Sequence, residues 1–268
     1  MTKALTASSI EGSIFNDIID LLQRQRQEPV QGPLTELRDQ LLAIYQSKSK
    51  DIPTCQMGLA LAYFGLGNHE DALRLATNAI RIASSESFVH DNALLIFINM
   101  GEFSFAHKVA TDSAKKVEGI PSSMDRIINA FGVTMDFAAA IHTIKQRLKI
   151  TDTNSDFDLN SALELFSELG HRADKLGYSQ PKLLAITECA AQTLKSHGHK
   201  IFLANIIGTH SSSAVLELHI DASPEDCAIL NYDVSGALFE KFGDRNGVDL
   251  MPISVHSFAG QQIAHHTH

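Results

Sequence analysis

The sequence predicts an α+β protein in which an N-terminal helical-hairpin repeat is followed by a small α+β domain with a three-stranded, mainly antiparallel sheet. Three observations predict this architecture. Apolar residues recur at helical spacing through the first 150 residues, glycine and alanine recur 34 residues apart within that region, and the alternation typical of strands begins only after residue 200. We therefore expect two domains, residues 1–150 and 151–268, with a flexible C-terminal tail.

The composition is typical of a globular chain. With 44% hydrophobic and 20% charged residues, the chain is expected to bury substantial cores. A formal net charge of −9, with scattered lysine and arginine, argues against a nucleic-acid partner. We find no apolar run of about 18 residues and no signal-peptide pattern, so we expect no membrane partner and a cytoplasmic location.

The cysteines give no sign of a metal or cofactor site. Cys55, Cys189 and Cys227 lie far apart and outside any zinc-ligand spacing. A cytosolic protein keeps such thiols reduced, so a disulfide framework is not expected either. The motifs therefore predict no metal ligands and no cofactor.

Helix after helix is expected in the first 150 residues. Residues 10–24 and 34–46 carry apolar side chains at helical spacing, and segment 27–33, with two prolines and a glycine, separates them. A further helical region is expected over 124–147. These flanking helices should complete the stack formed by residues 53–120, because a repeat unit leaves an apolar face that its neighbours must cover.

The internal repeat lies in residues 53–120. At an offset of 34, Gly67 aligns with Gly101 and Tyr63 aligns with Phe97. Further pairs at this offset are Ala72 with Ala106, Ala76 with Ala110, Ala79 with Ser113, Leu66 with Met100, and Leu75 with Val109. Glycine permits the tight turn between two antiparallel helices, and a small residue five positions later lets the helices approach closely.

This pattern resembles the tetratricopeptide-repeat family, whose unit is a helix–turn–helix of 34 residues. The first unit, 53–86, matches the family at Leu59, Ala60, Tyr63, Gly67, Ala72 and Ala79. It departs from the family at Gln56, Ala76 and Ser84. The second unit, 87–120, keeps Phe97, Gly101, Ala106 and Ser113. A third unit is suggested around 126–147, but its glycine, Gly132, is out of register.

The resemblance implies that the first helix of each unit lines a concave groove for a partner peptide or helix. Carried over by register, the groove positions are Met57, Leu61, Phe64, Phe88, Asp91, Leu95, Ile98 and Asn99. Most of these residues are apolar, and an apolar surface of this kind is normally covered. The covering is either a protein partner or the chain's own N-terminal helices, which would make these residues part of the core.

The pattern changes in the C-terminal region. The expected elements are two helices, two strands, a helix and a strand, at 159–176, 181–196, 200–207, 215–221, 223–242 and 250–257. Ser223 as N-cap and Pro224 at the first helical position form a strong helix start. Because 200–207 is an almost continuous apolar run, we place that strand centrally, in the order 2-1-3, with helices on one face of the sheet.

Polar side chains alternate along the strand at 215–221. Glu217, His219 and Asp221 share one face, and His256 lies on the last strand. Neighbouring imidazoles and carboxylates can bind a metal or act as acid and base. The same alternation arises on any half-exposed strand whose outer face meets solvent, so a solvated face is the competing interpretation.

The main functional hypothesis is therefore a non-enzymatic protein–protein interaction module of the adaptor, chaperone or regulator kind. The alternative is an enzyme or metal-binding domain that uses His219, Asp221 and His256. A third hypothesis is a homo-oligomeric scaffold joined through the sheet edge. Gly236, inside the helix at 223–242, marks close contact either with the sheet or with a partner, because glycine there weakens the helix.

Overall fold

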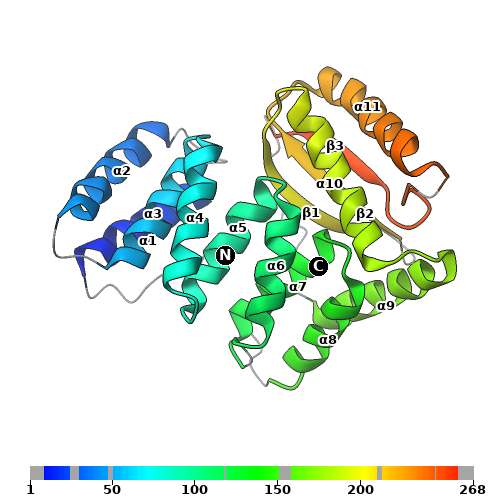
Figure 1. Ribbon diagram of the computed structural model, residues 1–268, viewed down its shortest axis with the longest axis horizontal. Helices are drawn as coiled ribbons and strands as arrows, with labels where there is room; N and C mark the ends of the chain where they lie inside the picture. The colour runs from blue at the N-terminus through cyan, green and yellow to red at the C-terminus, as the bar shows by residue number, and fades with distance from the viewer. Residues whose placement is uncertain are drawn as a thin grey trace. The chain divides into compact units, whose positions relative to one another are not determined.

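Figure 1 shows the computed structural model, which describes residues 9–24, 30–47, 51–117, 119–150, 158–209, 213–244 and 246–258. These residues form eleven helices and three strands, so the α+β class is confirmed. They divide into two compact units, one up to Ile96 and one from Phe97 onward. The expected domain boundary at residue 150 stays a prediction. The polar segment 151–157 and the expected tail lie outside the described residues.

The first unit is a layered set of helices. It contains α1 (Ile10–Arg24), α2 (Gln31–Gln46), α3 (Ile52–Gly65), α4 (His69–Ile82) and the start of α5 (Ser87–Asn99). Helix α3 packs against α1, α2 and α4. A Cβ at Gly58 of α3 would lie 2.6 Å from Leu41 Cδ2 and 3.3 Å from Phe15 Cδ2. The missing side chain therefore lets α1 and α2 approach α3 closely.

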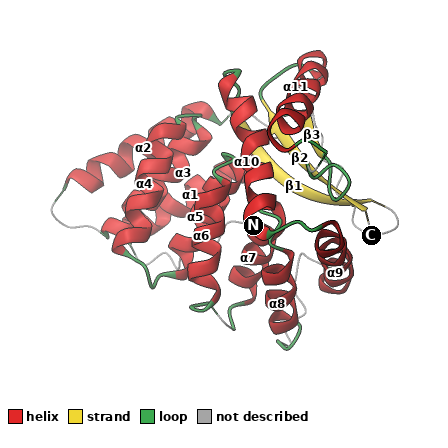
Figure 2. Ribbon diagram, turned by 45° about the vertical axis from the view of Figure 1, so that its right-hand side comes forward, coloured by secondary structure: helices red, strands yellow, loops and turns green. Residues whose placement is uncertain are grey.

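The second unit combines helices with the sheet. It contains the end of α5, α6 (Phe103–Ala114), α7 (Pro121–Val133), α8 (Phe137–Arg147), α9 (Leu159–Leu176), α10 (Gln180–Ser196), β1 (Ile201–Thr209), β2 (Ser213–Ile220), α11 (Pro224–Phe242) and β3 (Ile253–Ser257). Figure 2 shows the three strands as one sheet with α10 and α11 beside it. None of the described helices is long and apolar enough to cross a membrane.

The strand order differs from the expected one. The sheet runs β1-β2-β3, with β1 and β2 antiparallel and β2 and β3 parallel. The order 2-1-3 and the mainly antiparallel pairing are therefore wrong, and the sheet is mixed with β2 in the centre. The parallel pair follows from the connection, because a strand–helix–strand unit returns its second strand in the same direction.

The apolar run in β1 has a cause other than a central position. Helices α7 and α10 pack against β1, so apolar residues are needed on an edge strand that helices cover. The far end of the strand is open, and Ile207 is 43% exposed. The continuous apolar run therefore indicates that β1 is buried, but it does not show whether strands or helices bury it.

One turn geometry follows three helices at intervals of 34 residues. Gly67 after α3, Gly101 after α5 and Met135 after α7 have φ values of 73°, 65° and 55°. In each turn the next residue donates its N–H to a carbonyl five residues earlier: Asn68 to Tyr63, Glu102 to Phe97 and Asp136 to Phe131, all at 2.8 Å. This Schellman-type closure satisfies carbonyls at the helix end and leads into α4, α6 and α8.

The third hairpin has Met135, not Gly132, at the in-register turn position. A left-handed backbone costs a non-glycine residue about 1 kcal/mol, and burial of the Met135 side chain offsets this cost. Gly132 has a different role. A Cβ there would lie 2.9 Å from Phe166 Cζ and 3.0 Å from Ile206 Cδ1, so this glycine allows α9 and β1 to approach α7.

Replacing Gly101 with alanine is expected to destabilise the protein by about 2 kcal/mol, in part because of its left-handed backbone. The rest of the cost is steric, since the new Cβ would lie 2.5 Å from Ile201 Cδ1 and 3.1 Å from Ala191 Cβ. Gly198→Ala is the matched control, because Gly198 also has a positive φ of 84° but no heavy atom within 4 Å of a new Cβ. Urea unfolding should show the larger loss for Gly101→Ala, and equal losses would contradict this packing role.

Candidate functional sites

The eight groove positions carried over from the tetratricopeptide resemblance are mostly buried. Met57 and Leu61 are 0% exposed and Asp91 is 2% exposed, whereas Phe88 and Leu95 are half-buried. The three remaining positions, also buried, are Phe64, Ile98 and Asn99. Six of the eight positions are therefore buried, and two are half-buried. Partner binding by them stays a prediction and would require the chain to open.

Part of this covering comes from the N-terminal helices. Both α1 and α2 pack on α3, which carries Met57, Leu61 and Phe64. The ring of Phe15 on α1 also meets the ring of Phe88 edge-on, with 5.9 Å between their centroids. The chain's own N-terminal helices thus cover part of the apolar surface that a partner peptide would otherwise cover.

The sheet brings three of the sequence-predicted polar residues together. The parallel register pairs His219 of β2 with His256 of β3, and the two imidazoles stack with centroids 5.4 Å apart. The carboxylate of Glu217 spans both rings, with Oε2 3.1 Å from His219 Nε2 and Oε1 3.5 Å from His256 Nε2. Asp221, in contrast, is exposed just beyond the end of β2, and no contact with this cluster is seen.

The expected solvated face of β2 is in fact partly closed. His219 is only 2% exposed, and the side chain of His256 is 35% exposed. A substrate can therefore reach His256 but not the imidazole of His219. The arrangement suits a junction in which Glu217 accepts a hydrogen bond from His219, lies 3.5 Å from His256 Nε2 and so links β2 to β3.

Replacing Glu217 with alanine is expected to destabilise the protein by about 2 kcal/mol, because the buried imidazole of His219 loses its carboxylate partner. Glu217→Gln should lose less, since the amide oxygen can still accept one hydrogen bond. Asp221→Ala, at an exposed position on the same chain segment, should change stability by less than about 0.5 kcal/mol. Urea unfolding at neutral pH measures all three, and a Glu217→Ala variant as stable as Asp221→Ala would contradict the junction.

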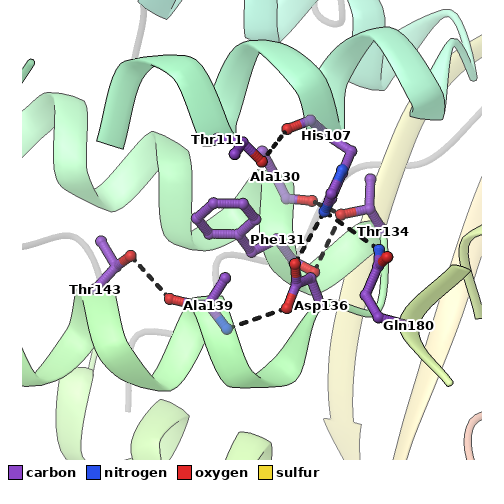
Figure 3. A network of polar contacts seen from close by, with 9 residues as sticks. All are labelled: His107, Thr111, Ala130, Phe131, Thr134, Asp136, Ala139, Thr143 and Gln180. Carbon is purple, nitrogen blue, oxygen red and sulfur yellow. Dashed lines mark hydrogen bonds and ion pairs between the residues drawn. The ribbon is translucent and has the colours of Figure 1, made fainter. Parts of the chain in front are cut away.

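A second polar cluster joins α6, the start of α8 and the start of α10 (Figure 3). His107 Nε2 lies 2.9 Å from Asp136 Oδ2 and 3.2 Å from Gln180 Nε2. Asp136 Oδ1 accepts the backbone N–H of Ala139 at 3.1 Å and so caps α8. The carboxylate of Asp136 therefore both caps the start of α8 and anchors the ring of His107.

The chemistry of this cluster follows from its donors and acceptors. A carboxylate only accepts, so His107 Nε2 carries the proton that it donates to Asp136. A nitrogen that donates to Asp136 cannot at the same time accept from the Gln180 amide, so Gln180 is a close neighbour rather than a donor. The nearby hydroxyl of Thr134 donates to the carbonyl of Ala130 at 2.8 Å and is not directed at His107. The cluster therefore joins α6 to the start of α8 by a hydrogen bond and places Gln180 of α10 beside it.

Helix α11 presents a surface that the sequence analysis did not single out. Ile229, Tyr232 and Phe239 are 62%, 81% and 59% exposed. The opposite face carries the buried side chains, which are Cys227, Leu230, Val234 and Leu238. The helix is therefore apolar on two opposite sides, one buried in the second unit and one open to solvent.

The orientation of α11 is held by Asn231. Its Nδ2 donates to the Val255 carbonyl at 2.9 Å, and its Oδ1 accepts the Val255 N–H at 2.7 Å. This pair of bonds occupies backbone groups of β3 that point away from β2, so it protects this part of the sheet edge. It also fixes which face of α11 is turned outward.

The outward face of α11 and the His107 cluster differ in how far the sequence signals them. A second apolar side of α11 could have been found from Tyr232 and Phe239, which are seven residues apart and lie opposite Leu230 and Leu238, but the spacing does not say which side is packed. The contact of His107 with Asp136 and Gln180 had no sequence signal, because it joins residues 29 and 73 positions apart.

No group of three or more His, Cys, Asp or Glu residues in the described ranges could hold a metal ion. No family model matches this chain, and no curated protein is significantly similar to it.

Proposed function

We propose that this chain is a protein–protein interaction module whose docking surface is the outward face of α11, defined by Ala228, Ile229, Tyr232, Ser235, Gly236 and Phe239. The single observation that carries the proposal is the exposure of Ile229, Tyr232 and Phe239 on one side of a helix whose other side is packed. Single exposed apolar residues are common, but an aligned apolar stripe usually marks a binding surface.

The remainder of the chain fits a scaffold of the tetratricopeptide kind. The 34-residue spacing of the turns at Gly67, Gly101 and Met135 supports this assignment, which goes beyond the coarser α+β class. In this proposal the partner docks on α11 instead of in the predicted groove. A cytoplasmic adaptor, chaperone or regulator would use such a surface to hold another polypeptide.

The proposal is tested with the double variant Tyr232→Glu, Phe239→Glu. Both side chains are more than half exposed, so the variant should keep the native circular-dichroism spectrum and unfolding midpoint. Chemical crosslinking in the native host, followed by identification of the attached proteins, should lose a specific partner in this variant. Ile82→Glu, at a 52% exposed position on α4, is the control and should retain it. Identical crosslinked proteins for all three chains would reject the proposed surface.

A further inference from the structure

We infer that the partner bound by the outward face of α11 is a basic amphipathic helix of another protein. The inference rests on the proposed docking surface and specifies the chemistry of its occupant. Three observations support it: the spacing of the exposed apolar residues on α11, the missing side chain at Gly236, and the acidic residues along one side of the helix.

The stripe has the shape of a helix contact. Glu225, Tyr232 and Phe239 are seven residues apart and lie along one line of the surface, and Ile229 and Gly236 form the neighbouring line. The exposed apolar residues of this face run from Ile229 to Phe239, which is about 15 Å of helix. An apolar face of this length and periodicity matches the apolar side of a second helix.

Gly236 leaves a hole in the middle of this face. A Cβ at Gly236 would meet no heavy atom within 4 Å, so neither the sheet nor any other described part of the chain needs the missing side chain. Glycine nevertheless costs a helix interior about 1 kcal/mol relative to alanine. Residues 232, 235, 236 and 239 are the four that surround one hole in knobs-into-holes packing, and its small members Ser235 and Gly236 leave room for a bulky side chain of the partner.

The flank of the face is acidic. Asp226, Asp233 and Glu240 each follow a residue of the Glu225–Tyr232–Phe239 line, so they form a row about 100° around the helix on one side of it. Residues 221–244 contain six acids and one base, Lys241. Lys241 lies two residues after Phe239 and therefore on the other side of the helix from the stripe.

This charge distribution distinguishes two candidate partners for the outward face of α11, a second copy of the chain and a basic helix. A second copy of the chain would bring the same acidic row to the same apolar face, so like charges would meet. A helix with lysine or arginine beside its apolar stripe would instead pair with Asp226, Asp233 and Glu240, of which Asp233 also lies 3.4 Å from His197 Nε2. Charge complementarity therefore favours the basic helix.

The test uses two synthetic, side-chain-stapled helical peptides with the same leucine stripe, one flanked by lysine and the other by glutamate. Fluorescence anisotropy should show that the full chain binds the lysine peptide at least about tenfold more tightly, and that added salt reduces the difference. Gly236→Leu, which fills the hole, should weaken this binding about tenfold without lowering the unfolding midpoint. Glu240→Lys should weaken it about threefold, and Ile82→Glu should leave it unchanged.

The outcomes separate this inference from the proposed function. Equal affinity for both peptides, or binding of neither, would overturn the basic-helix inference. A dimer in light scattering that Tyr232→Glu, Phe239→Glu converts to a monomer would overturn it in favour of a second copy. If crosslinking to a native partner depends on Tyr232 and Phe239 while both peptides fail, the docking surface stands and its partner is of another chemistry. If crosslinking shows no such dependence, the proposed function itself falls.

Discussion

Replacing Leu61 with glutamate is expected to destabilise the first compact unit by about 4 kcal/mol or more. Leu61 lies on α3 and is 0% exposed, so the substitution removes a packed apolar side chain and places a carboxylate where water cannot reach it. A loss of this size approaches the whole stability of many domains. We therefore expect the variant to lose its cooperative unfolding transition or to melt far below the unmodified chain, as measured by circular dichroism during heating.

Ile82→Glu is the matched control for this substitution. It introduces the same carboxylate on the neighbouring helix α4 at a position that is 52% exposed, and it should change stability by less than about 0.5 kcal/mol. The comparison also tests the predicted groove. A Leu61→Glu chain that remains folded with an unchanged midpoint would mean that α1 and α2 can leave α3, and that a partner can reach these positions.

Replacing Asp125 with alanine is expected to lower the free energy of unfolding by about 3 kcal/mol. The carboxylate of Asp125, on α7, accepts a hydrogen bond from Nε of Arg147 on α8 at 3.1 Å, and the arginine side chain is only 1% exposed. Removing this carboxylate takes one charged acceptor away from a guanidinium that stays buried, and losing such a contact costs more than the intact pair contributes. Urea unfolding at neutral pH gives the free-energy difference.

The controls for Asp125 separate a buried charge from lost packing. Arg147→Met removes the charge but keeps a long side chain, so the variant should be less destabilised than Asp125→Ala. Adding Arg147→Met to Asp125→Ala should recover part of the lost stability, because the buried guanidinium that lost its acceptor is then absent. If the double variant is no more stable than Asp125→Ala alone, the cost comes from packing and the ion pair is not its cause.

Local chemistry made much of the helical part predictable. Helix α1 spans the residues that its apolar spacing indicated. Helices α10 and α11 have Pro181 and Pro224 in their first turns, and the side chain of Ser223 caps α11. The turns at Gly67 and Gly101 could be predicted because a left-handed backbone favours glycine. Met135 could not be found in this way, since the cost of its backbone is offset by burial and burial has no local signal.

The candidate sites likewise depend partly on local residue spacing and partly on long-range packing. The sequence placed Glu217, His219 and His256 on strands with polar spacing, but only the parallel register of β2 and β3 brought the two imidazoles together and left Asp221 outside. The burial of Leu61 likewise depended on α1 and α2, whose packing on α3 is a long-range event.

By itself, then, the sequence determined where helices begin, turn and end in much of this chain, because those choices are made by neighbours within a few residues. Only the tertiary structure decided the central strand, the residues enclosed as core and the face of α11 left open. These outcomes depend on which distant apolar surfaces meet. Periodicity records that a side chain is to be covered, but it carries no information about the element that covers it.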